Sequence, residues 1–156
     1  MYFIAHGQDS EIITMLKNIP TVLPPELLKI LMEMGHGDEI VIADGNFPAA
    51  SHAQRLVRCD GLGAPPLLDA VLLLFPLDNF VKQAVALMAV VPGDHYTPEI
   101  WPVYKKLIQK HESQFVDFEM MERQAFYERA KKAYVIVATG EMARYANLIL
   151  KKGLIT

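Results

Sequence analysis

Short apolar runs alternate with amphipathic segments along this chain, and glycine, proline or acidic residues separate them. The segment that opens with Pro25 and Glu26 resembles a first helical turn, where proline and an acidic side chain are both favourable. Gly35 follows the last of its helically spaced apolar positions and predicts the helix end. These apolar positions are Leu27, Leu28, Leu31 and Met32. We therefore expect an amphipathic helix ahead of the first core strand.

Glu39–Ala43 is short and mostly apolar, which predicts a strand, and the sequence Asp-Gly-Asn-Phe-Pro at 44–48 predicts a loop after it. The same criteria predict further strands at Leu56–Cys59, Ala84–Val91, Phe115–Phe118, Tyr134–Ala138 and Tyr145–Leu150. They predict helices at Leu67–Phe75 after Pro65-Pro66, at Pro98–His111 with its regular part from Pro102, and at Arg123–Lys132. Because helices and strands alternate, we expect an α/β fold whose sheet is covered by helices on both faces.

The length of 156 residues fits a single domain. We interpret residues 1–14 as an N-terminal extension and residues 15–156 as the domain, with Met15 as an alternative start. The net charge of −3 argues against non-specific binding to nucleic acid or anionic lipid. No apolar run approaches the roughly 20 residues that span a bilayer. The one cysteine, Cys59, is interpreted as a core residue in a reducing compartment, so we expect a cytoplasmic protein.

His36 and Asp44 flank the expected strand Glu39–Ala43 and are the first candidates for chemistry. His36 stands between two glycines, where it either caps the helix end or acts as a general acid and base near neutral pH. Asp44 either forms a turn with its own backbone or accepts hydrogen bonds from the hydroxyl groups of a sugar. A strand advances about 3.3 Å per residue. The two side chains are therefore too far apart to touch, unless the Asp44 loop folds back or a neighbouring subunit contributes.

Three further polar residues lie in the C-terminal third of the chain. Arg123 is either an exposed arginine at a helix start or a ligand-binding residue. Tyr145 and Asn147 are separated by one residue and would point the same way in a strand. A phenol beside an amide suits a sugar, although both residue types are also common at strand starts.

Several well-known motifs are absent from the sequence. GxGxxG, GxxxxGK[ST], HExxH, CxxC and GxSxG do not occur, which leaves nucleotide, zinc, redox and serine-nucleophile chemistry without support. The remaining histidines lack metal-ligand spacing; they are His6, His52, His95 and His111. We expect neither a metal site nor a cofactor.

Several segments together are specific enough to suggest a family. PELLKILMEMGHGDEIVIADGNFP, followed by RCDG, FPLD, FYERAKKAYVIVATGE and RYANLILKKG, resembles the sugar mutarotase family of L-fucose mutarotase and D-ribose pyranase. The likeness runs from about Met15 to the C-terminus. FYERAKKA favours the fucose branch, whereas the loop 45–52 departs from the fucose pattern, because histidines before the phenylalanine and near Ala50 are missing.

The resemblance implies a three-layer α/β/α sandwich with a central mixed sheet, assembled as a ring-shaped homodecamer with its sites at subunit contacts. It implies that His36 transfers the proton and that Asp44 and Arg123 bind substrate. Tyr145, Ala146 and Asn147 match a C-terminal sugar-binding segment. The implied reaction interconverts the α and β anomers of a monosaccharide such as L-fucose, by ring opening without a cofactor.

Three alternatives stay open at this point. D-ribose pyranase-type chemistry interconverts pyranose and furanose forms by the same proton transfers, so the substrate profile would have to separate the two. A non-catalytic sugar-binding accessory to a transporter would bind sugar and tolerate the loss of His36. A purely structural oligomer would bind no sugar.

Overall fold

The computed structural model describes residues 14–156, so the expected extension 1–14 lies outside the described residues apart from Thr14. The strands are β1 (Thr14–Leu16), β2 (Ile19–Pro20), β3 (Glu39–Ala43), β4 (Leu56–Cys59), β5 (Val85–Met88), β6 (Glu119–Met121), β7 (Val135–Thr139) and β8 (Leu148–Lys151). The helices are α1 (Pro25–Glu33), α2 (Ala49–His52), α3 (Ala64–Leu74), α4 (Ile100–His111) and α5 (Arg123–Lys132).

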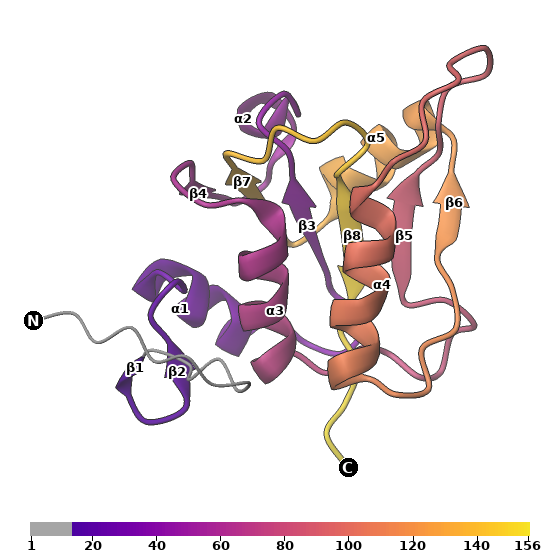
Figure 1. Ribbon diagram of the computed structural model, residues 1–156. Coiled ribbons are helices and arrows are strands. Elements are labelled where there is room, and N and C mark those ends of the chain that lie inside the picture. The colour runs from indigo at the N-terminus through magenta and orange to yellow at the C-terminus, as the bar shows by residue number, and fades with distance from the viewer. Residues whose placement is uncertain (1–13) are drawn as a thin grey trace, which may run out of the picture.

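A six-stranded sheet in the order β4-β7-β3-β8-β5-β6 forms the centre of the molecule (Figure 1). β3, β4 and β7 run parallel to one another, and β5 runs parallel to β6. β8 lies between β3 and β5 and runs antiparallel to both, so it is the one strand of this sheet with the opposite direction. β1 and β2 form a separate small sheet.

Alternate side chains of each central strand face two different helical layers. In β3, Ile40 and Ile42 belong to the core that includes α1, α3 and α4, whereas Val41 and Ala43 belong to the core that includes α2 and α5. Figure 1 shows α3 and α4 in front of the sheet and α5 behind it. The predicted α/β fold, with a mixed sheet between two helical layers, is confirmed.

The boundaries of three helices differ from the predicted ones, and α3 runs from Ala64 to Leu74 instead of ending at Phe75. The backbone leaves α1 at Met34 in an extended conformation with φ −68° and ψ 134°, so Gly35 does not end the helix through a positive φ. Gly37 has the positive φ, 87°, in the turn that leads into β3. α4 begins at Ile100 rather than at Pro102, because proline is tolerated in a first turn, whose N–H groups have no intrahelical acceptor.

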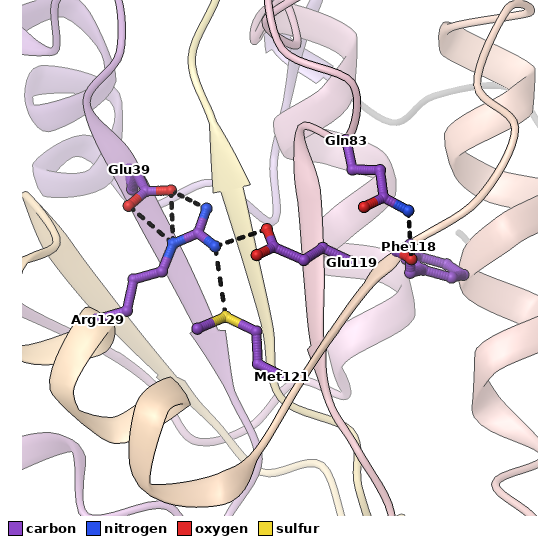
Figure 2. Close-up of polar contacts among 6 residues, drawn as sticks. All are labelled: Glu39, Gln83, Phe118, Glu119, Met121 and Arg129. Atoms are coloured by element: carbon purple, nitrogen blue, oxygen red, sulfur yellow. Dashed lines mark hydrogen bonds and ion pairs between the residues drawn. The ribbon is translucent and has the colours of Figure 1, made fainter.

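The strand predictions were wrong in extent or place at four positions, of which the smallest is the shift of β7 by one residue from the expected Tyr134–Ala138. The strand predicted at Ala84–Val91 is only the shorter β5 in the structure. The last strand starts at Leu148 instead of Tyr145. Phe115–Phe118 is not a strand, because the Gln83 amide binds the Phe118 carbonyl at 2.9 Å and pairing with β5 starts only at Glu119 (Figure 2). The four-residue helix α2 and the strands β1 and β2 were not predicted.

Arg129 ties α5 to the sheet through a network of ionic contacts (Figure 2). Its guanidinium contacts both carboxylate oxygens of Glu39 on β3 and donates to Glu119 on β6 at 2.8 Å. The Arg129 side chain is 20% exposed and that of Glu39 is 16% exposed. The hydrogen bonds that Arg129 donates to Glu39 and to Glu119 raise the pKa of Arg129. The network therefore fixes the position of α5 relative to two strands that are not neighbours.

Candidate active site

The loops that follow the parallel strands meet at one edge of the sheet, where α/β proteins commonly bind ligands. Asp44 follows β3, and the loop of residues 140–147 connects β7 to β8 across the end of β3 (Figure 1). The Asp44 N–H donates to the Asn147 Oδ1 at 2.7 Å, and the Gly45 N–H donates to the Glu141 carbonyl at 2.8 Å. These bonds hold the carboxylate of Asp44 beside the amide of Asn147.

A hollow of about 210 Å³ opens to solvent at this edge of the sheet. A carboxylate, two amides, a guanidinium and two phenol rings reach it, together with apolar side chains. Such a mixture suits a small polar ligand with an apolar face. The residues that line the hollow are Asp44, Asn46, Phe47, Met88, Tyr127, Met142, Ala143, Arg144, Tyr145 and Asn147.

The carboxylate of Asp44 is partly removed from water in this hollow. Burial raises its pKa above the ordinary value of 3.8 and outweighs the opposing backbone hydrogen bonds from Asn46 and Phe47. The Asn46 N–H donates to the Asp44 Oδ1 at 3.0 Å, which is the turn expected for an aspartate in this position. The turn accounts for one oxygen of the carboxylate. The hollow gives a ligand access to the Asp44 side chain.

Tyr145 and Ala146 are held in place by α4 rather than by strand pairing. Tyr145 has a left-handed backbone with φ 56°, and its carbonyl accepts the indole N–H of Trp101 at 2.8 Å. The Ala146 carbonyl accepts the buried Tyr104 hydroxyl at 2.7 Å, and burial raises the pKa of Tyr104. The segment 145–147 is therefore a rigid loop, and the prediction that it begins a strand was wrong. Tyr145 and Asn147 nevertheless line the same hollow.

His36 lies in the loop before β3, at the opposite edge of the sheet from Asp44. Its Nε2 lies 3.2 Å from the Oδ1 of Asp78, and its ring lies 5.4 Å from that of Phe80. Burial works to raise the pKa of Asp78, but the Phe80 N–H and His36 outweigh it and lower this pKa. The His36 side chain is 40% exposed and that of Asp78 is 4% exposed. Within the chain, His36 and the hollow around Asp44 are separate.

Arg123 starts α5 directly after β6, at the same sheet edge as the hollow. Its side chain is exposed and is not among those that line the hollow. The structure thus brings together Asp44, Tyr145 and Asn147 and places Arg123 near the same edge. Residues 14–156 contain no cluster of three His, Cys, Asp or Glu side chains that could hold a metal ion. No helix in this part of the chain is long and apolar enough to cross a membrane.

Known proteins are closely similar to this chain in sequence and architecture. The model of the RbsD / FucU transport protein family matches residues 17–155. The chain belongs to this family. The family resemblance expected from the sequence is therefore confirmed.

Individual family members show how far the similarity extends. Fucose mutarotase of Mus musculus is 52% identical over 145 residues, which cover 88% of this chain and 94% of the mouse protein. L-fucose mutarotase of Actinobacillus pleuropneumoniae is 47% identical over 139 residues, which cover 89% of this chain and 96% of that protein. The solved fucose mutarotase of Streptococcus pneumoniae, in complex with L-fucose, is 53% identical with a TM-score of 0.85 and covers 90% of this chain and 100% of that one.

Some residues of the hollow in this family member were not identified from the sequence. Tyr127 lies within the FYERAKKA segment, so a signal for it was present. Its ring meets those of Phe47 and His52 edge-on, with centroids 5.5 and 5.6 Å away. Arg144 opens the RYANLILKKG segment, but it was not singled out, since a charged residue before Tyr145 is ordinary in a surface loop. Only the fold shows that both line the hollow.

Gly140 is expected to be essential for the position of the loop 140–147. A Cβ on Gly140 would collide with the backbone carbonyl of Asp60, so Gly140→Ala forces the two loops apart. We expect this variant to lose about 1–3 kcal/mol of its free energy of unfolding, as overpacked positions do. Urea unfolding would measure the loss. Gly61→Ala in the facing loop is the matched control, because a Cβ on Gly61 meets nothing within 4 Å. Equal stability of the two variants would contradict the expectation.

Proposed function

We propose that this protein is a fucose mutarotase-type isomerase, which interconverts the α and β anomers of a reducing monosaccharide, with L-fucose as the preferred substrate. The observation that carries the proposal is the 53% identity over 90% of the chain to a fucose mutarotase that was solved with L-fucose bound. The hollow supports it, because Asp44, Tyr145 and Asn147 offer a sugar a carboxylate, a phenol and an amide.

The reaction needs proton transfer at two oxygens of the sugar. A base removes the proton of the anomeric hydroxyl, the bond between C1 and the ring oxygen breaks, and the ring oxygen takes up a proton. The open aldehyde rotates about the C1–C2 bond and closes on its other face, which returns both protons. We assign the proton transfer to His36, since imidazole both accepts and donates protons near neutral pH.

We assign substrate binding to residues at the edge of the sheet where β3 ends. Asp44 and Asn147 hold sugar hydroxyls there, and Tyr145 and Ala146 complete the segment that faces the ligand. Arg123 extends the site from the start of α5. Held hydroxyls place the anomeric centre for proton transfer, which lowers the entropic part of the barrier.

A second copy of the chain supplies the histidine in this proposal. His36 and Asp44 lie at opposite ends of β3, so one subunit cannot present both to one sugar. The surface around His36 is suited to a subunit contact, because two apolar side chains near it are exposed. Phe80, beside the His36 ring, is 72% exposed, and Val116, which lines one hollow with Asp78, is 77% exposed. We propose a closed ring, a homodecamer, in which each site combines His36 of one subunit with Asp44 of the next. The buried free thiol of Cys59 fits our proposal that this assembly acts in the reducing cytoplasm.

Saturation-transfer proton NMR on equilibrated L-fucose tests the proposed activity. Irradiation of one anomeric proton signal should attenuate the other when the protein is added, because the enzyme exchanges the anomers faster than the signals relax. D-Ribose and D-galactose serve as competing substrates in the same experiment. Faster exchange with ribose than with fucose would favour pyranase-type activity. Sugar binding without any exchange would replace the proposal by a transport accessory.

A further inference from the structure

The loop between β5 and α4 reaches across to the loop 140–147 and contacts it through one carboxylate. The Oδ2 of Asp94 accepts the Tyr145 hydroxyl at 2.6 Å and also accepts from the Arg144 guanidinium. The Oδ1 of Asp94 accepts the N–H of Tyr96 at 3.0 Å. Arg144 and Tyr145 line the hollow, and Asp94 is not among the lining residues. Asp94 therefore acts on a ligand in the hollow through these two side chains.

The hydrogen bonds that the Tyr145 hydroxyl already makes leave it one way to bind a ligand. A phenol has one proton to donate and can accept through its oxygen. The proton goes to Asp94, and the oxygen accepts the Val91 N–H at 3.3 Å. What remains for a ligand in the hollow is acceptance of a hydrogen bond by the phenol oxygen. A sugar hydroxyl that faces Tyr145 must then be a donor.

The surroundings of Asp94 keep this arrangement fixed. The rings of Tyr96 and Tyr145 stack with centroids 6.1 Å apart and an angle of 26° between their planes. The Arg144 guanidinium lies over the Tyr96 ring, 4.6 Å from its centroid. The Tyr145 hydrogen bond, followed by that of the Tyr96 N–H, lowers the pKa of Asp94, so the carboxylate is ionised near neutral pH. An ionised carboxylate is an acceptor only, and it cannot return a hydrogen bond to the phenol.

We infer that Asp94 is a positioning residue that commits the phenolic proton of Tyr145 and so makes Tyr145 an obligatory hydrogen-bond acceptor for the sugar. The inference rests on the proposed function and specifies the direction of one hydrogen bond, from the sugar to the Tyr145 oxygen. Tyr145 then has no proton to give to the ring oxygen, so it is excluded as the acid of ring opening. The site selects, at one position, a sugar hydroxyl that donates.

Deoxy and deoxyfluoro analogues of L-fucose test this direction, because fluorine accepts a hydrogen bond weakly but cannot donate one. Binding can be followed through the fluorescence of Trp101, the one tryptophan of the chain, whose indole donates to the Tyr145 carbonyl. In the wild type, at the position that faces Tyr145, the fluoro and deoxy analogues should both bind about 10-fold more weakly than fucose, as expected for a lost hydrogen bond.

The variants Asp94→Ala and Asp94→Asn separate positioning from a purely structural role. Alanine frees the phenolic proton, so we expect the fluoro analogue to regain affinity relative to the deoxy analogue, because Tyr145 can now donate to fluorine. Asparagine keeps an oxygen acceptor for Tyr145 and should preserve the wild-type pattern of analogues. Asp60→Asn is the control, since this exposed carboxylate pairs with Arg58 outside the hollow. It should behave as the wild type does.

Several results would overturn the inference. Uniformly weaker binding of all analogues by Asp94→Ala, with the wild-type pattern retained, would show that Asp94 only supports the loop. If Asp94→Ala does not fold, Asp94→Asn still tests the inference. Asparagine should keep the requirement that the sugar hydroxyl facing Tyr145 donates, so a variant that binds the fluoro analogue as well as fucose would contradict the inference. Wild-type protein that neither binds nor exchanges fucose would overturn the proposed function itself, and the inference with it. That outcome is distinct, since it appears before any variant is compared.

Discussion

His36→Ala is expected to reduce the exchange of L-fucose anomers by about 10²–10⁴-fold, the usual contribution of a positioned acid and base. Alanine leaves the sugar hydroxyls bound by Asp44 and Asn147 but removes the group that we assign to the anomeric proton. The loss should therefore appear in kcat, with fucose affinity almost unchanged. Saturation-transfer NMR gives the rate, and titration of Trp101 fluorescence gives the affinity.

A second histidine of the chain provides a matched control for this variant. His111 on α4 also contacts a carboxylate, that of Asp69, at 2.7 Å, and it lies outside the hollow. His111→Gln should fold and exchange fucose as the wild type does. If His36→Ala keeps full exchange activity, His36 is not the proton-transferring group and its contact with Asp78 is purely structural.

Asp44→Asn is expected to lower kcat/KM for fucose by about 10²-fold while leaving the folded protein at least as stable as the wild type. The loss of activity follows because a hydrogen bond to a charged group contributes about 1.5–3 kcal/mol, and the variant has no charge there. The stability follows from the sign of the pKa shift. Burial raises the pKa of Asp44, so ionised Asp44 opposes folding, and this cost grows as the pH rises above the ordinary value of 3.8.

Urea unfolding at several pH values checks the stability part of this prediction. The advantage of Asp44→Asn should be largest near neutral pH and should vanish in acid, where the wild-type carboxyl is protonated in both states. Asp60→Asn should show the opposite sign, because the hydrogen bond from Arg58 lowers the pKa of Asp60. Asp60→Asn should also retain the activity of the wild type. A neutral-pH loss of stability in Asp44→Asn as large as its loss of activity would indicate that the aspartate mainly holds the loop.

Mixing the two inactive variants tests whether the site is shared between subunits. If each site takes His36 from one subunit and Asp44 from the next, an assembly refolded from equal amounts of His36→Ala and Asp44→Asn chains contains intact sites at about one position in four, since neighbours combine at random. Recovery of about a quarter of the wild-type activity would support the shared site. No recovery would place both residues in the site of a single chain.

The sequence predicted the local structure well wherever the signal was local. The alternating core of β3 and the helical stripe of α1 arise from residues close in the chain, and both elements were placed almost correctly. β6 was misplaced because its start depends on the register with β5, in which Ala86 pairs with Glu119. Such pairing is set by residues far apart in sequence and leaves little trace in the strand itself.

The candidate site shows the same division between local and distant signals. Asp44 could be predicted because it follows an obvious strand, and Tyr145 and Asn147 were named through a recognisable segment. Their conformation could not be predicted, since the left-handed backbone of Tyr145 depends on a bond from Trp101 on α4. The role of Asp94 was equally invisible, because it arises only where two loops 50 residues apart in sequence meet.

The single antiparallel strand has a consequence for how such a protein can change over time. Because β8 runs opposite to β7 and both flank β3, the connection between them is a short arch over the end of β3 instead of a crossover helix. Most of the arch lies outside the hydrophobic cores, and Ala146 is its one member there. Substitutions of Met142 and Arg144, which line the hollow but belong to neither core, can therefore alter which sugar is preferred without weakening the sheet. At these two positions, substrate preference can change independently of thermal stability.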